Sequence, residues 1–121
     1  TDLLNTAKDS VKTVIKDKVI EVREDLNAKK QAIMDDAKVQ ADKIRAEGKK
    51  QADAARAAAN SKIDKLVAEA GNNPIKKKAA ELAGNKLKKD ADEKASKIES
   101  AANNKADDLM DAAQKKADAI K

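Results

Sequence analysis

A spacing of eleven residues constrains this chain more than any other feature of its sequence. Apolar or small residues recur at that interval in several rows along the chain. Eleven residues fill three helical turns at about 3.67 residues per turn, close to the value for a straight α-helix, so each row stays on one helix face. The spacing therefore predicts long helices with a continuous apolar stripe and a right-handed or nearly straight supercoil.

The rows run through both halves of the chain. In the first half they are Leu4, Ile15, Leu26, Ala37, Gly48, Ala59 and Ala70; Val11, Val22, Ile33, Ile44, Ala55 and Leu66; and Val19, Ala41, Ala52 and Ile63. In the second half they are Leu87, Ile98, Leu109 and Ile120; Ala80, Ala91, Ala102 and Ala113; and Gly84, Ala95, Ala106 and Ala117. The large aliphatic residues keep the interval as well as the alanines do, so the period is not a by-product of alanine content.

The composition excludes several classes of protein. The 121 residues include no Phe, Tyr, Trp, His or Cys, and 40% of them are charged. Much of the apolar fraction is alanine, which buries little area per residue, so a compact globular core is not expected. The 27 basic and 22 acidic residues are interleaved, as on solvated helix faces. No apolar run is long enough to predict a membrane-spanning helix.

One strong break interrupts the helical pattern, in the sequence AEAGNNPIKK. Gly71 suits the left-handed position that ends a helix, while Asn73 suits an N-cap and Pro74 a first helical position. A short connection favours antiparallel neighbours. The sequence therefore predicts an all-α fold, a long antiparallel two-helix hairpin over residues 25–121 with its turn at 71–74.

The predicted seam between the two helices pairs large residues with small ones. Folding the second helix back about the turn places Gly48 opposite Ile98 and Ala59 opposite Leu87, as close packing requires. On this pairing Gly48→Leu disrupts the seam, whereas Gly48→Ala costs little. The predicted seam residues are Leu26, Ile33, Ala37, Ile44, Gly48, Ala55, Ala59, Leu66, Ala80, Leu87, Ala91, Ile98, Ala102, Leu109, Ala113 and Ile120.

Residues 1–24 form a separate aliphatic segment that the hairpin leaves without a partner. Unpaired apolar stripes mark interaction sites. Three arrangements remain open: pairing with a second chain to give a dimer, folding back as a third helix after a break near residues 25–27, or docking on a protein partner or membrane surface. The stripe consists of Leu3, Leu4, Val11, Val14, Ile15, Val19, Ile20 and Val22.

The sequence predicts no catalytic residues, cofactor or metal. General acid–base catalysis would fall on carboxylates or lysines alone, and no glycine-rich loop is present to hold phosphate. Asp107 and Asp111 share a helix face, but a straight helix cannot wrap a cation, so a solvated face is the interpretation. We therefore expect that the chain is not an enzyme.

Basic clusters at 75–78 and 86–89 raise the question of polyanion binding. Without aromatic residues to stack on bases, we expect no specific nucleic-acid binding and interpret these lysines as a solvated face. Lysines among the aliphatic residues of 3–22 also permit weak binding to an anionic membrane surface. That segment contains no Trp or Phe to anchor it in a bilayer.

Two families share features with the chain. Segments such as KADDLMDAAQKKADAIK resemble group 3 late-embryogenesis-abundant proteins, a resemblance that implies disorder in water and helix on drying or at membranes. The steric pairing across the turn and the aliphatic residues 1–34 depart from that family and favour a folded state. Residues 46–121 are similar to the helical C-terminal tails of bacterial AsmA-like envelope proteins. That resemblance implies an accessory coiled-coil domain on the periplasmic side, and it transfers no functional residues.

The expected function is therefore a non-catalytic structural or interaction coiled coil, part of a larger bacterial envelope protein. The chain begins at Thr1 rather than Met, which agrees with a processed protein or an excised domain. The alternative is a stress-protective or membrane-surface-binding protein with amphipathic eleven-residue repeats. Beyond the resemblance, the residues do not define a compartment.

Overall fold

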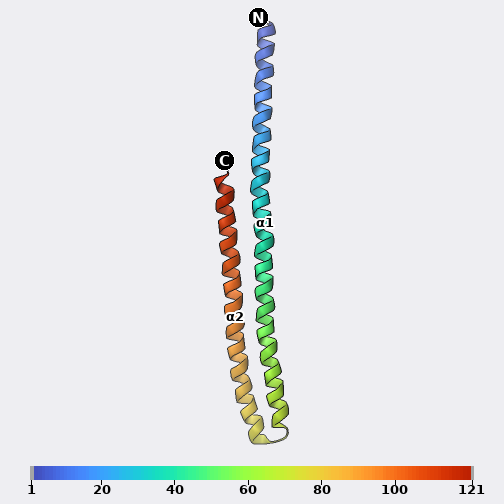
Figure 1. The fold of residues 1–121 in the computed structure, drawn as a ribbon, viewed down its shortest axis with the longest axis vertical. Helices are drawn as coiled ribbons and strands as arrows, with labels where there is room; N and C mark the ends of the chain where they lie inside the picture. Colours follow the sequence, from blue (N-terminus) through green and yellow to red (C-terminus); the bar gives the residue numbers. More distant parts are fainter. Residues whose placement is uncertain (1, 121) are drawn as a thin grey trace. The chain divides into compact units, whose positions relative to one another are not determined.

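Two long helices pack against each other as a hairpin in the computed structural model, which describes residues 2–120 and the side chains of residues 15, 16 and 18–120. Helix α1 comprises Asp2–Ala70 and helix α2 comprises Pro74–Ala119 (Figure 1). The structure is 96% helical, and its described part contains no strand. The predicted all-α two-helix hairpin is therefore confirmed.

The hairpin divides into two compact units. One comprises Thr1–Lys38 with Met110–Lys121, and the other comprises Val39–Leu109. Within each unit a stretch of α1 lies antiparallel to a stretch of α2. Helix α1 continues without interruption through residues 25–27. The alternative of a third helix that breaks at that point is therefore wrong.

The turn is closed by three consecutive local features. Gly71 has a φ of 55°, and its amide donates a hydrogen bond to the Ala68 carbonyl at 3.3 Å. The Asn73 amide donates to the Ala70 carbonyl at 3.2 Å. The Asn73 Oδ1 then accepts hydrogen bonds from the amides of Ile75 and Lys76, at 3.0 and 3.2 Å. Asn73 therefore caps α2 and satisfies amides that the first helical turn leaves without partners.

Alanine methyl groups form the centre of the seam. Ala41, Ala52, Ala95 and Ala106 are fully shielded from solvent, whereas no large side chain in the described part of the chain is fully buried. The longer aliphatic residues of the seam, such as Ile44 and Leu87, are half-buried. The helix backbones therefore approach closely, and the long side chains cover the two flanks of a narrow contact.

Gly48 lies against Ala102, not against the side chain of Ile98. A Cβ atom built on Gly48 would overlap the Ala102 methyl group, and the Ile98 carbonyl oxygen would lie 3.8 Å from it. Gly48 is therefore not a socket for the Ile98 side chain, because it faces Ala102 and the Ile98 backbone. The expectation that Gly48→Ala costs little is also wrong, because a methyl group has no rotamer with which to avoid a collision.

We predict opposite effects for alanine at two buried glycines. A Cβ on Gly84 would meet the Ile63 Cγ2 atom at 3.4 Å, an ordinary van der Waals contact. Gly84→Ala should therefore stabilise the hairpin by up to about 1 kcal/mol through helix propensity. Gly48→Ala should destabilise it by about 1–3 kcal/mol through overpacking. Urea unfolding followed by circular dichroism measures both changes.

The exchange Gly48→Ala with Ala102→Gly is the internal control for that prediction. It restores the space at the contact and keeps one glycine in the pair. We expect its stability to return to within about 1 kcal/mol of the original. An exchange variant no more stable than Gly48→Ala alone would show that the two positions do not meet.

The N-cap gives a second prediction. Asn73→Ala removes the acceptor for two amides of α2, so we expect a loss of about 1 kcal/mol of stability. Asn73→Asp keeps an acceptor of similar geometry and should retain most of it. The same urea titration compares the two variants, and equal losses for both would contradict a capping role.

Candidate interaction surfaces

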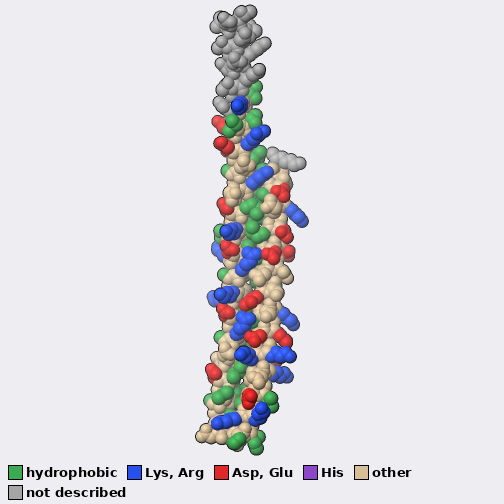
Figure 2. Space-filling model, turned by 180° about the vertical axis from the view of Figure 1, so that it is seen from behind, with side chains coloured by type: hydrophobic (Ala, Val, Ile, Leu, Met, Phe, Trp, Pro, Cys, Tyr) green, Lys and Arg blue, Asp and Glu red, His purple; other side chains and the backbone are tan. Residues whose placement is uncertain are grey.

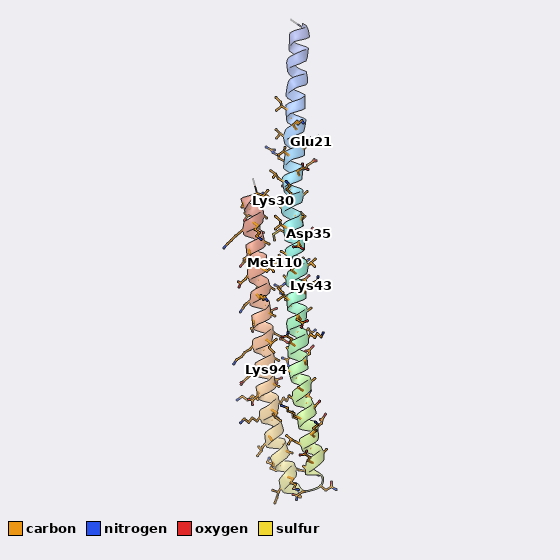
Figure 3. All side chains as sticks on the ribbon, in the orientation of Figure 1. Glu21, Lys30, Asp35, Lys43, Lys94 and Met110 are labelled. Carbon is orange, nitrogen blue, oxygen red and sulfur yellow. The ribbon has the colours of Figure 1, made fainter. Side chains whose placement is uncertain are left out.

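The first candidate surface is the aliphatic stripe of residues 1–24. The side chains of Leu3, Leu4, Val11 and Val14 lie outside the described part of the chain. The other four members of the stripe are exposed: Ile15 by 58%, Val19 by 45%, Ile20 by 43% and Val22 by 56%. In Figure 3, Glu21 lies on the stretch of α1 that extends beyond the last turn of α2, whereas Lys30 lies near that turn. In the row that contains Ile15, the next member, Leu26, is half-buried.

The residues expected in the seam lie together along the helix contact. Every one of them is buried or half-buried, including Leu26 and Ile120 near the end of α2. The predicted set omitted the residues that are most shielded, although the eleven-residue rows contained them. These residues are Ala41, Ala52, Ala95, Ala106, Ala117 and Gly84. They belong to the third row of each helix, which the predicted set left out.

Arginines connect the two helices at the flank of the seam. Arg45 donates a hydrogen bond from Nη2 to the Asp107 Oδ1 atom at 2.7 Å. Arg56 reaches two carboxylates of α2, with Nε 3.4 Å from Asp92 Oδ1 and Nη1 3.2 Å from Glu99 Oε1. The hydrogen bond that Arg56 donates to Glu99 raises the pKa of Arg56 above its usual range, against partial desolvation that lowers it. Arg56 therefore stays charged at any physiological pH.

These ion pairs were missed by the sequence analysis, although a signal was present. The chain has only three arginines, Arg23, Arg45 and Arg56, among many lysines. Arg45 and Arg56 are eleven residues apart, so they occupy equivalent positions on α1. The planar guanidinium group bonds to several carboxylate oxygens at once, whereas lysine acts as a hydrated point charge. A rare residue that repeats with the seam period marks a position at the helix contact.

A second candidate surface lies at the turn end of the hairpin. An open groove of about 380 Å³ runs between the helices there, and its apolar lining includes Ile63, Val67 and Ala70. Nearby, Ile75 is 81% exposed and Leu82 is 60% exposed. Figure 2 shows hydrophobic side chains next to lysines at this end of the molecule.

The acidic clusters do not converge on a metal site. Among the described residues, no group of three acidic side chains is placed to hold a metal ion. Asp107, which the sequence analysis paired with Asp111, takes part in the ion pair with Arg45. No helix in the described part of the chain is long and apolar enough to cross a membrane.

Comparison with known protein families, with curated proteins and with solved structures finds no match to this chain.

The ion pairs at the seam predict a salt-dependent loss of stability. Arg56→Gln removes both contacts to α2, so the melting temperature should fall more than for Lys50→Gln, a change at an exposed lysine of the same helix. In 1 M salt the Debye length falls to about 3 Å, and the difference between the two variants should shrink. Thermal melts by circular dichroism test this. If the melting temperature of Arg56→Gln is lowered as much in 1 M salt as at low salt, the loss comes from packing of the arginine stem instead.

Proposed function

We propose that this chain is a non-catalytic interaction module, a hendecad coiled-coil hairpin that associates with a second copy of itself through residues 1–24. From the resemblance of residues 46–121 to the tails of AsmA-like envelope proteins, we further propose that the module belongs to a larger protein of the bacterial envelope. The proposal includes no cofactor and no catalysis.

The observation that carries the proposal is the continuation of the seam pattern beyond the end of α2. Ile15, Val19 and Val22 stand eleven residues before Leu26, Lys30 and Ile33, all of which are half-buried at the contact with α2. The same face of α1 thus extends past its intrachain partner, with exposed aliphatic side chains at the seam positions. An apolar face that continues an existing helix contact is best covered by another helix of the same kind.

The charges of the segment favour a second copy over an anionic partner. Residues 1–24 contain five basic and five acidic residues, so the segment carries no net charge. Two copies therefore meet without net repulsion, and the attraction to an anionic bilayer is small. A symmetric dimer also requires nothing beyond the chain itself.

Arg23 fits the same arrangement. It lies at the position that Arg45 and Arg56 occupy in later repeats, where both reach carboxylates on the neighbouring helix. In a dimer, a helix of the second copy would supply such a carboxylate. This places Arg23 at the flank of the proposed interface.

We predict that charge at the seam positions abolishes the dimer. Sedimentation velocity should give a dimer for the unmodified chain and a monomer for Val19→Glu with Val22→Glu, because carboxylates would be buried in an apolar contact. Ile20→Glu is the matched control: it removes an aliphatic residue of the same segment, but the equivalent later positions are polar and exposed, Gln31 and Asp42. The control should remain dimeric.

Two results would overturn the proposal. One is a monomer for the unmodified chain across a wide range of loading concentrations. The other is loss of the dimer in Ile20→Glu to the same extent as in the double variant, which would show that general apolarity rather than the seam face drives association.

A further inference from the structure

The positive charge of the chain is concentrated at one place. Residues 75–89, the beginning of α2, contain six lysines and one glutamate, a net charge of five. The whole chain also has a net charge of +5, so the remaining residues balance each other. An excess of one sign on a few helical turns creates a field that attracts polyanions.

Two exposed aliphatic side chains lie within this basic stretch. Ile75 and Leu82 are seven residues apart, so they share a face of α2. The seam face lies elsewhere, because Ala80 is buried and Gly84 lies against Ile63 of α1. Helical spacing places three lysines on the same outward face as the aliphatic pair: Lys78, Lys86 and Lys89.

The lysines at the start of α2 are not explained by the hairpin itself. A helix N-terminus favours acidic residues, yet the first turn of α2 contains none. Within the described residues only Lys78 of the six makes an ion pair, with Glu81 at 3.8 Å. Lysines at a helix N-terminus oppose the helix dipole, and here few of them form ion pairs within the described part of the chain. Such a conflict is expected where residues serve a contact outside the chain.

We propose that this face, Ile75, Lys78, Leu82, Lys86 and Lys89, docks on the surface of an anionic lipid bilayer. The aliphatic side chains enter the headgroup region, and the lysines extend along it to the lipid phosphates and carboxylates. The proposal is independent of the self-association of residues 1–24, and it differs from the membrane contact considered for residues 3–22 in the sequence analysis.

The chemistry favours lipid over the other polyanions. The face has no aromatic residue to stack on a base and no arginine to hold a phosphate with two hydrogen bonds. In this chain arginine meets discrete carboxylates at the helix contact, whereas this face carries lysine alone. A nucleic-acid backbone also offers nothing to exposed aliphatic side chains. A second copy of the same face is disfavoured by like charge.

Flotation of the full chain with vesicles tests the proposal. We expect binding to vesicles of phosphatidylserine and phosphatidylcholine in equal amounts, no binding to phosphatidylcholine alone, and weaker binding as salt rises. Ile75→Ser with Leu82→Ser should lower the partition coefficient about tenfold or more. Lys78→Gln, Lys86→Gln and Lys89→Gln together should lower it about a hundredfold.

The control is Val39→Ser, which removes an exposed aliphatic residue of α1 that lies in neither proposed surface and leaves the lysine face unchanged. It should bind the anionic vesicles as the unmodified chain does, and circular dichroism should show equal helix content in all variants. Sedimentation velocity measures the oligomeric state of each variant, and only variants with the same state are compared. The vesicle result therefore does not depend on whether the proposed dimer forms.

Three outcomes would overturn the proposal. The first is no binding to the anionic vesicles at low salt. The second is an equal loss of binding in the control and in Ile75→Ser with Leu82→Ser. The third is binding to single-stranded RNA that is tighter than binding to vesicles and unaffected by the two serine substitutions, which would identify a phosphate backbone as the partner.

Discussion

The close approach of two helix backbones is the constraint on which the rest of this structure depends. The most shielded residues are alanines, and Gly48 lies where even one additional methyl group would collide with Ala102. Small residues allow the helices to come near enough for long aliphatic side chains to close the flanks of the contact. A chain without aromatic residues obtains a specific hairpin in this way, because the packing is set by where side chains are small.

Arginine and lysine occupy different positions in this structure. Arg45 and Arg56 lie beside the seam and reach carboxylates of α2, whereas the described lysines are all exposed except Lys30, which is half-buried. Arg23 continues the eleven-residue series of Arg45 and Arg56 toward the N-terminus, which supports the proposed helix contact there. The lysine-only stretch at the start of α2 fits a diffuse anionic surface better than a partner with fixed carboxylate positions. The two proposed contacts thus use different chemistry at different places along the chain.

Sequence reasoning succeeded where the determining interactions are local or periodic. Gly71, Asn73 and Pro74 each act on the backbone within a few residues, so the two helix ends follow from their identities. The period of eleven indicates which face of each helix lies at the contact, but it leaves open how far one helix slides along the other. Gly48 meets Ala102, one turn from the expected Ile98 and on the same face of α2, whereas Gly84 meets Ile63 within one residue of the predicted pairing. The carboxylate partners of the arginines could not be predicted either. Acidic residues recur along α2, and only the register of the two helices selects among them.

A seam lined with methyl groups also determines how the stability of the hairpin varies with temperature. The heat capacity of unfolding follows the apolar surface that becomes hydrated, and it is usually about 12–15 cal/mol/K per residue. A contact in which only small side chains are fully shielded hydrates little new apolar surface when it opens. The heat capacity change should therefore be well below that range, and the curve of free energy against temperature should be shallow. Such a hairpin loses stability gradually on heating and resists unfolding in the cold.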